Sequence, residues 1–248
     1  MKRLLRYYFF IYQACWHVRV TKAFVAFCGK MIRGTQSKWM QKRIADLQAN
    51  VHEAMPLCVR SLNEHHVFFW LDFGTLLGAY RENGIIAHDY DVDLAVWDDV
   101  DPQLVDQAFA KVGFHKLRTF EKDFKPVCVS YVYKGVVVDI MYYRHDENNN
   151  GKAYCYDVYN IPNIFIDEKQ LFNIVGLRKI TFSVSDFHSI VFLGEKVNIP
   201  LNTEEYLKEY YGKDFMTPDP NFYGHTTPGN LEVIDPLEGF AVYRYYPH

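Results

Sequence analysis

The most constraining feature of this chain is a run of aspartates at every second position, Asp89, Asp91 and Asp93, which leads into an apolar stretch. In an extended chain, alternate side chains point to the same side. The three carboxylates would therefore crowd one side of an extended segment that leads into a strand over residues 92–96, while Val92, Leu94 and Val96 point into a core. Like charges at this spacing repel one another, and a hard divalent cation with oxygen ligands relieves the repulsion. The pattern favours a metal site over a solvated acidic turn.

A fourth acid, Asp139, stands alone in the apolar run of residues 136–141. A carboxylate inside a buried strand needs a partner, because its desolvation is otherwise uncompensated. The metal site of the earlier aspartates is the natural partner, and backbone amides are the alternative. We therefore expect Asp139 to lie beside Asp91 and Asp93 in the folded chain.

Gly74 and Thr75 directly follow residues 67–71, a short apolar run that predicts a strand. Glycine lets a backbone amide approach a phosphate group closely, and a threonine hydroxyl adds a second donor. This pair predicts a phosphate-binding turn close to the acidic cluster.

Hydrophobic spacing and turn residues predict helices and strands interleaved along the chain. Apolar residues recur every three or four positions over residues 37–65, in a helix that Pro56 is expected to kink or restart. The other expected elements are a helix between an Asp101 cap and Gly113, a hairpin over 127–133 and 136–143, a strand-rich region 180–199, and a helix over 203–211 with Asn202 and Glu205 as its capping box. Such interleaving predicts an α/β or α+β domain.

Charge is distributed unevenly. Residues 1–43 hold ten Lys or Arg and no acid, whereas residues 44–248 hold 17 basic and 30 acidic residues. The charge-free run between Arg6 and Arg19 is shorter than the roughly 20 apolar residues that cross a bilayer, and no small-residue cleavage site follows it. We expect residues 1–43 to be a basic amphipathic segment, with residues 1–33 on an anionic membrane surface, and 44–248 to be the catalytic domain. A basic helix packed on that domain is the alternative.

Cysteine usage and charge indicate the cellular compartment of the protein and the class of its partners. The five cysteines include no CxxC pair, which argues against a disulfide framework or zinc knuckle and indicates reduced thiols in the cytosol. The acidic body lacks the basic stripe of a nucleic-acid-binding protein. We therefore expect a cytoplasmic protein, held at the inner face of a membrane through its basic segment, with no nucleic acid as partner.

Two blocks of this sequence resemble the LicD family, which includes the fukutin and fukutin-related proteins. The first block holds Gly-Thr-Leu-Leu-Gly-Ala-Tyr-Arg at 74–81, Ile85-Ile86 and the acidic run from His88 to Leu94; the second holds Val197–Pro200 and Tyr206–Lys213, followed by Phe215 and Pro218. Together they cover about residues 66–220. Ala87-His88 replaces the family's Pro-Trp before the acidic run, so we expect base stacking or loop shape there to differ from the family's.

The resemblance implies a nucleotidyltransferase-like fold, a mixed sheet flanked by helices. It also implies transfer of phosphocholine or ribitol phosphate from a CDP-activated alcohol to a hydroxyl of a cell-surface glycan. In such an enzyme, Asp91 and Asp93 would hold Mg²⁺ or Mn²⁺ across the donor diphosphate. Asp139 would complete a two-metal site or take the acceptor's proton, and Asp89 would be a further ligand or a nearby acid.

The same resemblance assigns three residues to the donor phosphates. Gly74 and Thr75 would hold phosphate oxygens, and Arg81 would neutralise charge on the diphosphate. For Arg81, a structural ion pair with a nearby Asp is the alternative.

Phosphocholine transfer is favoured within the family, because the 19 tyrosines could supply a cage for a quaternary ammonium group. CDP-ribitol is the close alternative donor, and the glycan acceptor is expected to be lipid-linked. Two other classes stay open. One is a sugar-nucleotide glycosyltransferase, in which a DxD motif also holds the metal, and the other is a non-catalytic binding protein of the same fold.

Overall fold

The computed structural model describes residues 22–149, 151–159, 174–219, 228–236 and 238–246. The chain divides into two compact units, residues 1–43 and 44–248, and the division falls where the basic segment ends. The second unit combines helices with a large sheet, which confirms the predicted mixed α/β class. Three cysteines of this unit, Cys58, Cys128 and Cys155, are buried free thiols.

Helix α2 extends over Lys22–Glu64 and crosses the boundary between the units. Within the second unit, its buried face repeats every three or four residues, as the sequence predicts. This face consists of Leu47, Val51, Ala54, Met55, Cys58, Val59 and Leu62. The helix continues through Pro56, so the predicted restart at this residue does not occur.

The second unit is built on one mixed sheet, which has 11 strands in the described part of the chain. In chain order these are β1 (Trp70–Leu71), β2 (Val92–Trp97), β3 (His115–Lys122), β4 (Lys125–Tyr133), β5 (Val136–His145), β6 (Lys152–Tyr159), β7 (Ile174–Ser183), β8 (Phe187–Phe192), β9 (Glu195–Pro200), β10 (Leu231–Val233) and β11 (Phe240–Tyr245). β2 pairs in parallel with β5, and β1 with β9. The other pairs are antiparallel.

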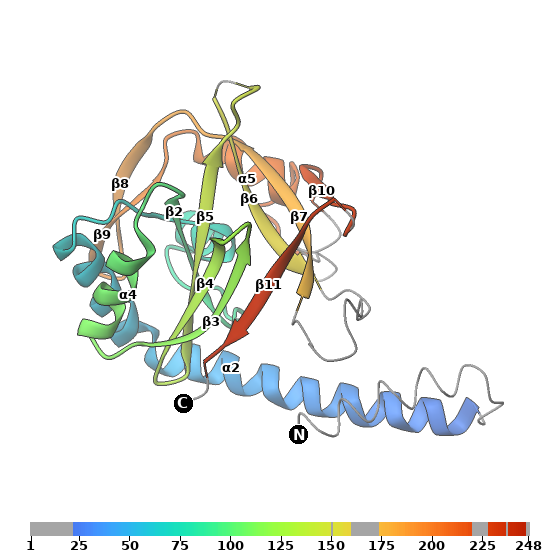
Figure 1. Ribbon diagram of the computed structural model, residues 1–248. Coiled ribbons are helices and arrows are strands. Elements are labelled where there is room, and N and C mark those ends of the chain that lie inside the picture. Colours follow the sequence, from blue (N-terminus) through green and yellow to red (C-terminus); the bar gives the residue numbers. More distant parts are fainter. Residues whose placement is uncertain (1–21, 150, 160–173, 220–227, 237, 247–248) are drawn as a thin grey trace. The chain divides into compact units, whose positions relative to one another are not determined.

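Six of these strands form a closed ring. β5 pairs with β4 and β6, β6 pairs with β7, and β11 joins β7 to β3, which pairs with β4. Figure 1 shows β11 lying between β7 and β3. Tyr131 of β4 faces outward, because its ring stacks on Phe109 of helix α4 (Pro102–Lys111) with centroids 4.1 Å apart. The neighbouring Ser130 and its β5 partner Asp139 therefore face the interior of the ring.

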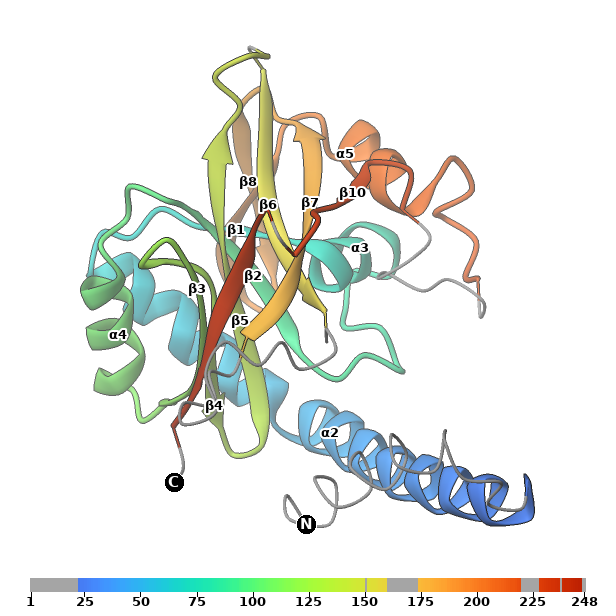
Figure 2. The ribbon, with the colours of Figure 1, turned by 45° about the vertical axis from the view of Figure 1, so that its right-hand side comes forward.

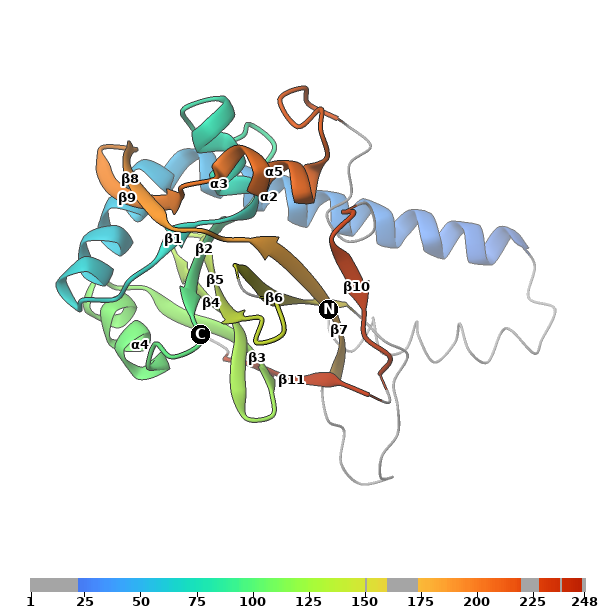
Figure 3. The same ribbon diagram turned by 90° about the horizontal axis from the view of Figure 1, so that it is seen from above.

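Two further helices cover the sheet. Helices α3 (Phe73–Arg81) and α5 (Thr203–Tyr211) pack against each other, with the rings of Phe73 and Tyr210 4.9 Å apart. Figure 2 shows α4 on one side of the sheet and α3 and α5 on the other, and Figure 3 shows α3 beside α5. This arrangement places the start of α3 next to β2.

The predicted helix caps have different outcomes. Asp101 caps α4 as predicted, since its side chain accepts a hydrogen bond from the N–H of Gln103. Asn202 makes no such bond at the start of α5. Its amide donates instead to the carbonyl of Ser183 at 2.9 Å, which ties α5 to the end of β7. The prediction of a capping box at α5 was therefore wrong.

The predicted hairpin is confirmed as β4 and β5. Its turn residues Lys134 and Gly135 both have positive φ, 47° and 83°, which suits the right-handed twist of the two strands. A Cβ at position 135 would overlap the carboxylate of Asp46 on α2. Glycine is therefore required both by the turn and by the close approach of α2.

Candidate active site

Asp93 and Asp139 are Cα partners in the parallel pair of β2 and β5. Paired residues present their side chains on the same face, so the two carboxyl groups are neighbours. Burial removes water from the carboxyl group of Asp93 and raises its pKa well above the ordinary value of 3.8. Repulsion from Asp91, Asp89 and Asp139 raises this pKa further. The structure thus brings together the four aspartates that the sequence singled out.

Asp89 lies against the start of α3. A Cβ on Gly74 would stand 2.8 Å from Asp89 Oδ2, so only glycine leaves room for this carboxylate. Burial raises the pKa of Asp89 to about 6. The close approach at Gly74 that the sequence assigned to a phosphate is made here by a carboxylate of the chain itself.

Two oxygens of the cluster, Asp89 Oδ2 and Asp139 Oδ1, are buried and have no hydrogen-bond partner among the described residues. Such atoms are costly unless a ligand satisfies them. Carboxylate oxygens are hard donors that suit Mg²⁺ or Mn²⁺. Yet within the described ranges no group of three or more His, Cys, Asp or Glu side chains is arranged to hold a metal ion. The donor chemistry fits a divalent cation, while closing its coordination sphere would take side-chain rotation or oxygens from a substrate.

Gly74 and Thr75 do not form the predicted turn but belong to the first turn of α3. Thr75 is fully buried, and its Oγ1 accepts a hydrogen bond of 2.8 Å from the backbone N–H of Asp93. This contact fixes the start of β2 against α3. Thr75 therefore positions Asp93, and its burial is inconsistent with the predicted phosphate contact.

Asp72 has no role in the sequence-based prediction, yet it caps α3 from a fully buried position. Its carboxylate accepts hydrogen bonds from the N–H of Phe73 at 2.9 Å and from the hydroxyls of Tyr143 and Tyr206, both at 2.7 Å. Burial raises the pKa of Asp72 to about 6. An acid directly after an apolar strand and before a helix is the sequence signal that identifies such a cap.

Arg81 makes a structural ion pair, which was the alternative to phosphate binding, but its partner is Glu82 and not an aspartate. Its Nη2 lies 2.7 Å from Glu82 Oε1, and its Nη1 donates to the carbonyl of Phe215 at 3.3 Å. The side chain is only 9% exposed. Arg81 therefore ties the end of α3 to the segment after α5, and a diphosphate would have to compete with these contacts.

Arg118 of β3 is a cation that the sequence-based prediction did not include. Its Nη2 donates to Asp139 Oδ2 at 3.2 Å, and its Nε donates to Ser130 Oγ at 2.7 Å. The sequence holds little sign of this contact, because residues 115–122 lack a clear hydrophobic alternation.

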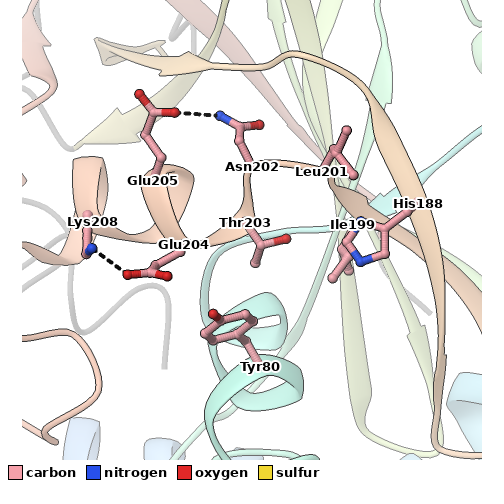
Figure 4. A pocket seen from close by; sticks show the side chains of 9 residues that line it. All are labelled: Tyr80, His188, Ile199, Leu201, Asn202, Thr203, Glu204, Glu205 and Lys208. Atoms are coloured by element: carbon pink, nitrogen blue, oxygen red, sulfur yellow. Dashed lines mark hydrogen bonds and ion pairs between the residues drawn. The ribbon is translucent and has the colours of Figure 1, made fainter.

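A separate open pocket of about 600 Å³ lies between α3, the β8–β9 pair and the start of α5 (Figure 4). It is lined by Tyr80, His188, Ile199, Leu201, Asn202, Thr203, Glu204, Glu205 and Lys208. Figure 4 shows two hydrogen-bonded pairs among these residues, Lys208 with Glu204 and Asn202 with Glu205. None of the predicted catalytic or phosphate-binding residues lines this pocket, so it is distinct from the aspartate cluster.

The predicted membrane-surface segment, residues 1–33, falls mostly outside the described residues. In the part of the chain that the structure describes, no helix is both long enough and apolar enough to span a bilayer.

The chain belongs to the LicD family. The family model described as LicD/FKTN/FKRP, nucleotidyltransferase domain, matches residues 66–202, more than half of the chain and all of the aspartate cluster. The chain is therefore identified as carrying a nucleotidyltransferase domain of this family. The match ends before α5, so the second block of resemblance lies largely beyond it.

The relatives include transferases of a sugar alcohol phosphate. The chain is 27% identical over 184 residues to ribitol-5-phosphate transferase FKTN of Mus musculus and 26% identical over 183 residues to that of Homo sapiens. Each match covers 73% of this chain and 36% of the relative, so the chain spans little more than a third of these transferases. An uncharacterised protein of Rickettsia typhi is 28% identical over 143 residues, which are 56% of this chain and 42% of that protein.

Proposed function

We propose that this chain is a cation-dependent transferase that moves an alcohol phosphate from a CDP-activated donor to a hydroxyl group of a glycan. The observation that carries the proposal is the aspartate cluster, in which carboxyl groups repel one another and two buried oxygens have no hydrogen-bond partner among the described residues. A divalent cation with the diphosphate it binds would relieve both costs. Family membership and the similarity to ribitol-5-phosphate transferases support the same reaction class.

Each acid of the cluster has a proposed role. Asp91 and Asp93 hold Mg²⁺ or Mn²⁺, which when bound neutralises charge on the donor diphosphate. Asp139 takes the proton of the acceptor hydroxyl while the hydroxyl oxygen bonds to phosphorus and CMP leaves. Asp89 holds the first turn of α3 beside the cluster. The amide of Gly74 in that turn is the proposed donor to a phosphate oxygen, since the first amides of a helix lack partners within the helix.

Ribitol phosphate is favoured over phosphocholine as the transferred group. The curated relatives are named ribitol-5-phosphate transferases. In addition, tyrosines on β6 already face cations of this chain. The Lys179 Nζ lies 4.3 Å from the ring centroid of Tyr154, and the Arg144 guanidinium lies 5.4 Å from that of Tyr156. These rings are therefore occupied, which weakens the argument for a quaternary ammonium cage.

The deciding experiment supplies CDP-ribitol, CDP-choline or a UDP-sugar with Mg²⁺ and a glycan acceptor, and measures the nucleotide released. Release of CMP from CDP-ribitol supports the proposal, and release from CDP-choline alone would make phosphocholine the transferred group. Release of UDP would indicate a glycosyltransferase. If neither the wild type nor the Asp93→Asn variant releases nucleotide from any donor, the result would favour a binding protein of this fold.

The acceptor glycan is proposed to be lipid-linked, with the chain held at the cytoplasmic face of a membrane by residues 1–33. The basic composition of this segment supports the proposal, because a chain at the membrane surface is close to acceptors assembled there.

A further inference from the structure

Arg118 reaches the aspartate cluster across two neighbouring strands. It starts on β3, donates from Nε to Ser130 Oγ of β4, and donates from Nη2 to Asp139 Oδ2 of β5. Its guanidinium carbon lies 5.6 Å from the ring centroid of Phe120. Three adjacent strands thus support one row of hydrogen bonds on the interior side of the strand ring.

The two oxygens of Asp139 consequently have different surroundings. Oδ2 accepts from Arg118, whereas Oδ1 is buried without a hydrogen-bond partner in the described part of the chain. A carboxylate without a fixed partner would exchange its two oxygens by rotation. The planar fork of Arg118, held in turn by Ser130, keeps Oδ2 in place and leaves Oδ1 for another group.

The guanidinium also changes the charge of the cluster. Arg118 places a positive charge within hydrogen-bond distance of Asp139, whose β2 neighbour is Asp93. That charge opposes any further cation that approaches the carboxylate. Position and charge are separable, because lysine can keep the charge but cannot make both contacts of the fork.

We propose that Arg118 is a positioning residue of the transferase, which holds Asp139 with Oδ1 turned to the reacting groups and limits the affinity of the cluster for a cation. The consequence for turnover rests on the proposed function, whereas the consequence for cation binding does not depend on the donor.

The test compares wild type with Arg118→Gln, Arg118→Lys and Ser130→Ala as full chains. Terbium luminescence, with competition by Mg²⁺, measures cation binding without donor, and CMP release gives kcat and KM. Arg118→Gln should bind terbium roughly threefold to tenfold more tightly, because a nearby positive charge is lost. Its kcat should fall about 100-fold with little change in KM, because Asp139 is no longer held.

Arg118→Lys separates the two effects. Its terbium affinity should stay close to that of the wild type, while its kcat falls nearly as far as that of the glutamine variant. Ser130→Ala, which loosens the fork but keeps the arginine, should show a smaller loss of kcat. The matched control is Arg244→Gln on β11, whose ion pair with Glu121, at 3.1 Å, is more than half exposed on the arginine side; both readouts should be unchanged.

The outcomes distinguish this inference from the proposed function. A wild-type kcat in Arg118→Lys would overturn the positioning role, and equal terbium affinity in Arg118→Gln and wild type would overturn the limit on cation affinity. If Arg118→Gln does not fold, the lysine and Ser130→Ala variants carry the test. A wild type that releases no CMP from any donor, together with the expected terbium results, would overturn the proposed function and leave the role of Arg118 in cation binding supported.

Discussion

In the protein without a bound cation, the aspartates of the cluster repel one another, and this repulsion lowers the stability of the fold. Asp93 is crowded by three other aspartates of the cluster, and burial and repulsion together disfavour its charge. Thr75 and Gly74 hold this arrangement together, one by a hydrogen bond to Asp93 and the other by admitting Asp89. A site that stores repulsion in this way should become more stable when a charge is removed, and lose function at the same time.

Asp93→Asn tests this opposition. The substitution should raise the free energy of unfolding by about 1–2 kcal/mol, because the amide carries no charge to repel the other carboxylates. Turnover should fall about 100-fold or more, because a proposed cation ligand is lost. Thermal unfolding and CMP release measure the two effects. Asp99→Asn, in the exposed acidic turn after β2, is the control and should change neither. An Asp93→Asn protein with near-wild-type activity would show that the ligand assignment is wrong.

Asp72 makes a prediction about pH. Its pKa is raised from 3.8 to about 6 in the folded protein by burial, so the folded state holds the proton more tightly than the unfolded state. The stability that this carboxyl contributes is therefore complete below pH 3.8 and is lost as the pH rises through 6. The loss amounts to about 3 kcal/mol at most.

Asp72→Asn should remove this part of the pH dependence, since asparagine is also a good helix cap and does not titrate. Urea unfolding of both proteins between pH 4 and pH 7 measures it. Asp89 titrates in both proteins, and the difference between the two curves reports Asp72 together with its repulsion of Asp93. A difference that does not change with pH would show that Asp72 keeps an ordinary pKa in the folded chain.

At the scale of elements, the turn between β4 and β5 needs glycine for two reasons, its own backbone conformation and its contact with helix α2. Gly135 adopts positive φ and also lies against Asp46 of α2. Gly135→Ala should therefore cost about 2–4 kcal/mol, the sum of a backbone penalty and a steric overlap. Gly151→Ala is the matched control, because Gly151 has a similar φ of 85° but no atom of the described residues lies within 4 Å of its added Cβ. Its cost should be about 1 kcal/mol. Equal losses of stability in urea would mean that the contact with α2 contributes nothing.

Elements with strong local signals were predictable from sequence, and those fixed by distant contacts were not. Helix α4 has its Asp101 cap and its glycine stop, and the β4–β5 hairpin has alternating residues around a turn. Helix α3 was missed because Gly74 and Gly78 are poor helix formers, and it is held instead by the Asp72 cap and by packing on α5. Strand β11 pairs with β3 and β7, which lie far from it in the chain, so no local pattern marks its place.

At the scale of the whole molecule, the closed ring of strands explains which parts of the site could be predicted. The aspartates were predictable because their alternation is a local property of the sequence, although only Asp93 lies on β2 and Asp89 and Asp91 precede it. The lone acid in β5 stood out against its apolar neighbours. Arg118 and Ser130 meet Asp139 only because β3, β4 and β5 are adjacent in the ring. The hydroxyl of Tyr143 reaches Asp72 from β5, and the hydroxyl of Tyr206 reaches it because α5 packs beside α3. Such contacts are decided by topology, which the pattern of a single sequence does not contain.

The uneven charge of the chain leads to a prediction about location. Residues 1–33 carry seven basic residues and no acid, and each basic residue gains about 1 kcal/mol near an anionic bilayer. Changing Lys2, Arg3 and Arg6 to Gln in the full chain should therefore weaken binding to anionic vesicles about 100-fold, while CMP release with a soluble acceptor stays unchanged. Co-sedimentation with phosphatidylserine vesicles measures the binding, and high salt should weaken that of the wild type because the attraction is screened. The matched control changes three exposed lysines of the body, Lys125, Lys196 and Lys213, to Gln. If the two triple variants lose binding equally, attraction is a property of the whole surface; if neither binds less than the wild type, the membrane role of residues 1–33 is wrong.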